Sequence, residues 1–96
     1  MSDDRLGDLP DEDIPHDVRA ALAQLLEEAR GAASTGDAET AAALLETAGT
    51  VAENKLPPGE RRDRIRQGCE TARGALPDGD LAAEYAGAAL GYVPEA

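Results

Sequence analysis

Apolar residues recur every three or four positions through most of the chain, the spacing of an α-helix with one buried face. Pro15 suits a first helical turn, and the pattern then predicts a helix to about Ser34 with inward positions Val18, Leu22, Leu25, Leu26, Ala29 and Ala33. Thr35-Gly36-Asp37 predicts a break. Gly36 is expected just past the end of this helix, and Asp37 as the N-cap of the next.

The second helix is expected over residues 38–55. Its inward stripe is predicted at Ala41, Leu44, Ala48, Val51 and Ala52, with Leu45 beside it. Leu56-Pro57-Pro58-Gly59 ends this helix, because the residue before a proline is sterically pushed out of the α region.

The third helix is expected over residues 59–75, with an apolar stripe of Ile65, Cys69, Ala72 and Leu76. Pro77-Asp78-Gly79-Asp80 has the composition of a turn. A fourth helix then covers residues 81–93 and stops at Pro94. The predicted fold class is therefore all-α, with four helices in two antiparallel hairpins that form either a bundle or a short repeat-like stack.

The two hairpins share a sequence echo. Ala29-Arg30-Gly31-Ala32 precedes Gly36-Asp37, and Ala72-Arg73-Gly74-Ala75 precedes Gly79-Asp80, with the same offset of 43 residues in both pieces. Duplication of one hairpin explains the echo, and so does chance in a chain rich in Ala and Gly.

Composition limits the core and the location. A chain of 96 residues makes one domain, and with 20 Ala, 11 Leu and neither Phe nor Trp its core is modest. Residues 1–13 hold six acids and little to bury, so we expect a flexible acidic arm there and a single domain over residues 14–96. There is no apolar run of membrane-spanning length, no signal peptide and only one cysteine, so we expect a cytoplasmic protein.

Charge is distributed unevenly. The chain has 20 Asp+Glu against 9 Lys+Arg, yet six of the nine cations lie between residues 55 and 73. Because arginine makes bidentate contacts with carboxylates, the third helix is predicted to dock an acidic protein partner through Lys55, Arg61, Arg62, Arg66 and Arg73. The alternative is that these cations pair internally with Glu39, Glu46, Glu53 or the acidic arm. A net charge of −11 and two aromatic residues do not favour nucleic acid as the partner.

No residue pattern points to catalysis, a metal or a cofactor. Cys69 lies on the inward stripe of the third helix, and the only histidine, His16, begins the first helix, so a buried core thiol is favoured over a nucleophile. Asp78, Asp80 and Glu84 lack calcium-loop spacing and suit turn and N-cap roles. The chain is expected not to be an enzyme and to hold no metal or cofactor.

The fourth helix is apolar nearly all round. Leu81, Tyr85, Ala88, Ala89 and Tyr92 form one apolar face, and Ala82, Ala86, Leu90 and Val93 continue to a second. A small four-helix monomer covers only one side of its last helix, so we expect a homodimer in which helix four self-associates through Tyr85, Ala86, Leu90 and Val93.

Two resemblances add to this interpretation. Gly36-Asp37 with Ala29, Ala41 and Ala48 makes the first hairpin (residues 22–55) similar to a tetratricopeptide-type repeat, although the bulky aromatics of that family are missing.

The second resemblance covers more of the chain. The run Gly36-Asp37, Leu44-Leu45, Val51, Asn54-Lys55-Leu56-Pro57, Arg61, Arg64, Gly68-Cys69 and Ala83-Glu84-Tyr85 resembles small uncharacterised acidic all-helical proteins of halophilic archaea. That resemblance implies a domain of unknown function and transfers no activity.

The sequence therefore predicts a small cytosolic protein–protein interaction module that docks through its basic third helix. The competing hypothesis is a small-molecule or nucleotide-binding regulator, or an enzyme that uses Cys69. The two differ in whether polar groups converge on a pocket around Cys69 or spread over an exposed face.

Overall fold

The described part of the chain, residues 14–93 of a computed structural model, is built from four helices: α2 (His16–Ser34), α3 (Ala38–Lys55), α4 (Glu60–Ala75) and α5 (Gly79–Leu90). No residue in that range is in a strand, so the all-α prediction is confirmed. The predicted acidic arm, residues 1–13, and residues 94–96 lie outside the described residues.

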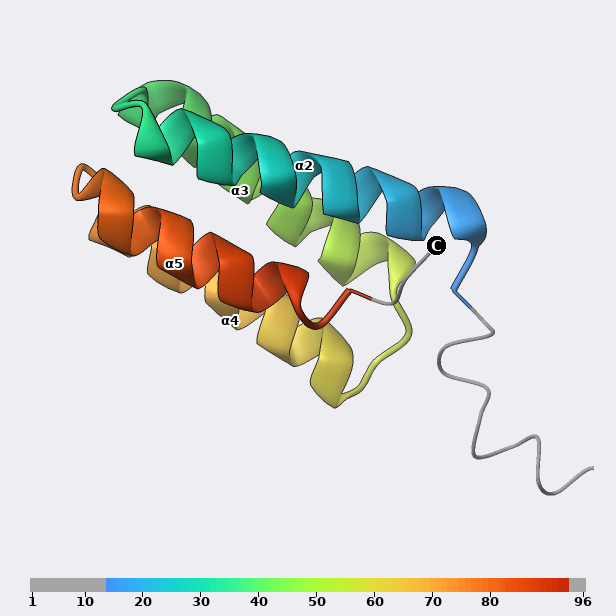
Figure 1. Cartoon of the computed structure of the whole chain (residues 1–96). Helices are drawn as coiled ribbons and strands as arrows, with labels where there is room; N and C mark the ends of the chain where they lie inside the picture. Colours follow the sequence, from blue (N-terminus) through green and yellow to red (C-terminus); the bar gives the residue numbers. More distant parts are fainter. Residues whose placement is uncertain (1–13, 94–96) are drawn as a thin grey trace, which may run out of the picture.

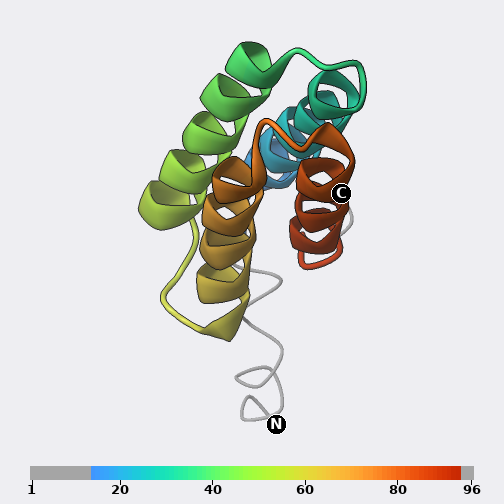
Figure 2. The same cartoon turned by 90° about the vertical axis from the view of Figure 1, so that its left-hand side faces the viewer.

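The helices form a closed ring. Each packs against the next in the chain, and α5 packs back against α2 (Figures 1 and 2). Short connections make consecutive helices antiparallel (Figure 1). In a linear stack α5 would not return to α2, so of the two predicted arrangements the molecule adopts the bundle.

The first turn follows the prediction. Gly36 has φ 87°, the left-handed conformation that a glycine adopts without steric cost. Its N–H donates to the carbonyl of Ala33, the N–H of Asp37 donates to that of Ala32, and together these bonds close a Schellman motif. The Asp37 carboxylate then accepts from the N–H of Thr40 at 3.2 Å and caps α3.

The bounds of the last two helices differ from the prediction. Gly59, predicted as helical, is the N-cap of α4 at φ 155°. The last helix begins at Gly79 instead of Leu81, because the Asp78 carboxylate accepts from the N–H of Leu81 at 3.2 Å and caps it there. It ends at Leu90 instead of Val93, and Tyr92 and Val93 continue in tighter turns that bond to the carbonyls three residues back.

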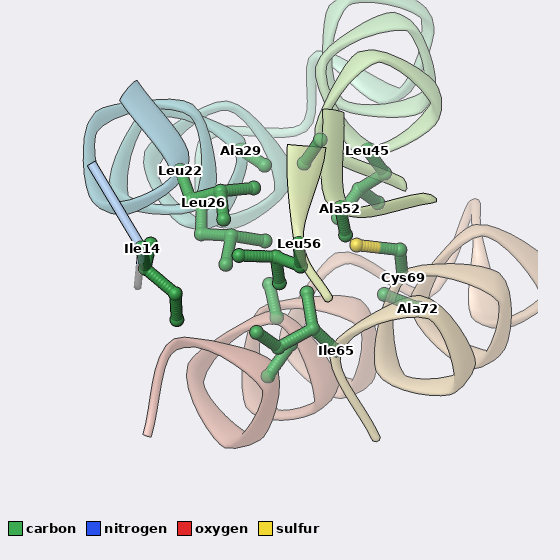
Figure 3. Packing of buried hydrophobic residues seen from close by; sticks show 13 residues of the cluster. Ile14, Leu22, Leu26, Ala29, Leu45, Ala52, Leu56, Ile65, Cys69 and Ala72 are labelled. Carbon is green, nitrogen blue, oxygen red and sulfur yellow. The ribbon is translucent and has the colours of Figure 1, made fainter. Parts of the chain in front are cut away.

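The core has two parts. The larger cluster contains every buried Leu and Ile of the described chain, with Ile65 and Leu56 facing Leu22 and Leu26 (Figure 3). The smaller consists of Ala33, Ala41 and Ala82, at the end of the bundle where the α2–α3 and α4–α5 turns lie. On α3 the stripe is centred on Leu45, which is buried, whereas Leu44 and Val51 are only partly buried, so the predicted centre was wrong by one position.

Small residues let the helices approach closely. A methyl group added at Gly68 of α4 would come within 2.8 Å of the Cβ of Ala89 on α5. The inward positions of α5 are alanines (Ala82, Ala86 and Ala89) for the same reason. Because alanine buries little area, the few large core side chains supply much of the apolar burial.

Candidate functional site

The five predicted partner-binding residues do not form one surface. Lys55 is exposed at the C-terminus of α3, and Arg62 lies beside Leu56 and Pro57 of the α3–α4 loop. Arg61 faces the turns that follow α5, where its Nη1 donates to the carbonyl of Tyr92 at 3.1 Å. Arg66 and Arg73 face α3. On α4, Arg61 lies on one side of the buried Ile65, and Arg62, Arg66 and Arg73 lie on the other, so the bundle separates them.

Arg66 and Arg73 line a groove between α3 and α4 with a volume of about 220 Å³. The opposite rim carries Glu46 and Glu53 of α3, and Glu70 lies between the two arginines. On each rim the two like charges are seven residues apart, about two helical turns or ~10.5 Å. We call this feature the α3–α4 groove; one of its rims is basic and the other acidic.

The two rims do not neutralise each other by direct contact. Among the described residues the ion pairs within 4.0 Å are Arg30–Glu27, Arg62–Asp63 and Arg64–Glu60, and none involves Arg66 or Arg73. Internal pairing of these two arginines with Glu39, Glu46 or Glu53 is therefore not formed. Sequence reasoning named both glutamates only as internal partners, although their seven-residue spacing matches that of the arginines.

Cys69 forms part of the groove floor but is itself buried, with 2% of its surface exposed. Burial raises the pKa of the thiol to about 11, while the charge of Arg73 lowers it and that of Glu70 raises it. A nucleophilic cysteine needs a lowered pKa and a neighbouring base. No histidine lines the groove.

We expect Cys69 to behave as a buried small hydrophobe. A thiol reagent should modify it slowly in the folded protein at neutral pH and rapidly in denaturant, and Cys69→Ala should cost about 1 kcal/mol of stability. Since the unfolded thiol ionises near 9.0 and the folded one near 11, this group should also lower stability as pH rises through that interval. Labelling kinetics followed by mass spectrometry test the first point. Native labelling as fast as in denaturant would contradict it.

The residues predicted for self-association fall largely inside the fold. Ala86 is buried in the core, and Leu90 and Val93 are partly buried against it. That apolar face is the inner face of α5, so Ala86 was a wrong assignment to an interface. Tyr85 is exposed, on the outer face with Leu81 and Tyr92.

The acidic residues near the last turn have structural roles. Asp78 caps α5, and Asp80 lies in its first turn. Within residues 14–93, no three His, Cys, Asp or Glu side chains are grouped closely enough to hold a metal ion. None of the four described helices combines the length and the apolar character that a membrane span requires.

Comparison with known proteins gives one result. No curated protein and no solved structure matches the chain. A family model described as "Domain of unknown function (DUF8101)" matches residues 9–95, which include the whole helical bundle. The chain therefore belongs to the DUF8101 family.

Proposed function

We propose that this domain is a small protein-binding module whose α3–α4 groove takes an acidic segment of a partner. The observation that carries the proposal is that Arg66 and Arg73 face the groove without an ion pair to the acids of the opposite rim. A guanidinium offers a rigid fork that fits a carboxylate in a bidentate contact. Two such forks about 10.5 Å apart suit a segment with two carboxylates at that separation.

The acidic rim makes the two sides of the groove different in charge. Glu46 and Glu53 would repel the acidic edge of the partner and attract a basic edge, so the segment that fits best has acids along one side and bases along the other. Charge complementarity of this kind contributes specificity more than affinity.

Composition supports a cytoplasm of high salt as the setting. A net charge of −11 on 96 residues is screened at molar salt, where the Debye length is about 3 Å. Under those conditions long-range steering is weak, and binding depends on short direct contacts such as arginine–carboxylate pairs.

The competing enzyme hypothesis is less well supported. Polar groups do converge near Cys69, but the thiol is buried, its pKa is raised instead of lowered, and the groove lining contains no histidine. These features favour a groove that binds over a groove that catalyses.

Charge reversal on the basic rim tests the proposal. A chain with Arg66→Glu and Arg73→Glu should lose its partner, with at least a tenfold fall in affinity, about 1.4 kcal/mol for two exposed pairs. The readout is quantitative mass spectrometry of proteins captured by the immobilised full chain from cytosol of the source organism at molar salt. Helical circular dichroism should be unchanged, because neither arginine is buried.

Two controls separate a groove effect from a general charge effect. Arg30→Glu alters an exposed arginine on α2, away from the groove, and should retain the partner. The reversed-rim chain, with Glu46→Arg and Glu53→Arg added to the first two changes, keeps the net charge at −11 and should still lose it. Undiminished capture by the folded Arg66→Glu, Arg73→Glu chain would refute the proposal.

A further inference from the structure

The chain has two aromatic residues, and both lie on the surface of the bundle. Tyr85 and Tyr92 are 36% and 40% exposed, and with Leu81, at 40%, they are the exposed large apolar side chains of the described residues. A fold with so little core material would bury its aromatics if nothing else required them, because each offers a large apolar area. Tyrosine at an exposed apolar site is typical of protein interfaces.

These side chains form a regular line. Leu81, Tyr85, Ala88 and Tyr92 follow at intervals of four, three and four residues, the spacing of a coiled-coil seam. Ala88 is exposed like the others, and the turn bonds after Leu90 keep Tyr92 in line with α5. We call these four residues the outer seam. The same spacing, one residue later, gives the buried positions Ala82, Ala86 and Ala89, so α5 has an inner seam that is packed and an outer seam that is open.

The outer seam lies in a segment with few charged residues, unlike the rest of the chain. Glu84 is the only charged residue between Leu81 and Val93, in a chain with 20 acids. A second copy, itself at −11, therefore meets little negative charge on this face. Depletion of charge at the centre is also a general property of interfaces.

We propose that two copies of the chain pair through their α5 helices, antiparallel, about a two-fold axis between Tyr85 and Ala88. In that arrangement Tyr85 lies opposite Ala88 of the second copy, and Leu81 lies opposite Tyr92 of the second copy. Every layer then sets a large side chain against a smaller one, and the same surface serves both copies, as a two-fold interface requires. A parallel pair would instead set Tyr85 against Tyr85 and leave a gap at Ala88.

The ends of the seam are complementary in charge. Arg64 of α4 lies beside Tyr92, with its Nη1 3.4 Å from the tyrosine hydroxyl and its guanidinium carbon 5.8 Å from the ring centre. Since Tyr92 lies opposite Leu81 of the second copy, Arg64 comes to the start of that copy's α5. Asp80 and Glu84 are one and three residues from Leu81 there. The antiparallel pair thus places a cation at an acidic helix N-terminus twice, which is a favourable arrangement.

A size exchange between two positions tests the pairing. Sedimentation equilibrium of the full chain at molar salt should give twice the chain mass. Ala88→Tyr sets two tyrosines against each other, and Tyr85→Ala leaves a cavity, so each should weaken the dimer about 30-fold or more, as for a central interface residue. The chain with both Tyr85→Ala and Ala88→Tyr again has a large side chain opposite a small one. It should regain most of the lost affinity.

Controls keep the result specific. Ala21→Tyr changes an exposed alanine on α2 and should not alter the dimer. Arg66→Glu with Arg73→Glu should also leave the dimer intact. The dimer and the binding of a partner in the α3–α4 groove are therefore tested independently. A monomer for the natural chain at high micromolar concentration would overturn the inference, and so would a doubly exchanged chain that dissociates as much as the single variants.

Discussion

Gly79→Ala should destabilise the bundle by about 3 kcal/mol or more, the upper part of the range for overpacking. A methyl group at this position would overlap the carbonyl of Ala33 in the last turn of α2. That carbonyl cannot move aside cheaply, because it accepts the Gly36 N–H in the Schellman motif that ends α2. The added methyl group therefore clashes with the Ala33 carbonyl oxygen, which its hydrogen bond to Gly36 holds in place.

A second glycine supplies the matched control. Gly74 lies in the last turn of α4, is exposed, and has nothing within 4 Å of an added methyl group. Gly74→Ala should therefore stabilise the protein by about 0.5 kcal/mol, since alanine loses less backbone entropy than glycine in a helix. Urea unfolding followed by circular dichroism compares the two. Equal stability of both variants would mean that α2 and α5 do not approach as closely as described.

The start of α5 shows where local sequence reasoning reached its limit. The 43-residue echo made Asp80 the counterpart of Asp37, but Asp78 caps the helix. The first helix of the second hairpin ends at Ala75, whereas α2 continues two residues past the equivalent Ala32, so the N-cap follows the echo two residues sooner in the second hairpin. After the turn the hairpins correspond at an offset of 41, which pairs Ala41 with Ala82, Leu45 with Ala86, and Ala48 with Ala89. All of these residues are buried. A constant offset of 43 would pair Ala41 with the exposed Glu84 instead, so the hairpins are more alike than that offset indicates.

Which face of α5 turns inward could be determined only from the packing of the helices. Both faces are apolar, so periodicity does not decide which one turns inward. The close approach of Gly68 to Ala89 decides it, because the narrow space between α4 and α5 admits alanine and excludes tyrosine. The arginine flanks of α4 were predictable from the helical wheel. The neighbour of each flank was not, because it depends on how the four helices close into a ring.

Two adjacent leucines of α3 also differ in burial in a way that the sequence pattern did not resolve. Leu45 is buried at 1% exposure and belongs to the small set of large, fully buried side chains, whereas Leu44 is only partly buried at the edge of the cluster. Leu45→Ala should therefore cost about 3–4 kcal/mol, and Leu44→Ala about 1–2 kcal/mol, because only the first removes a fully buried side chain. The Leu45 cavity closes poorly, since α3 and α4 already meet at Gly49 and Cys69, where an added Cβ would lie 3.7 Å from its neighbour.

The comparison of Leu45→Ala with Leu44→Ala is free of chemical differences, because the two substitutions remove the same atoms from neighbouring positions of one helix. A loss of 3–4 kcal/mol is a large fraction of the 5–15 kcal/mol that stabilises a typical domain, so Leu45→Ala should melt well below the natural chain and below Leu44→Ala. Thermal and urea unfolding at molar salt measure both. If Leu44→Ala proved the more costly, the stripe predicted from the sequence would describe the core better than the packing described above.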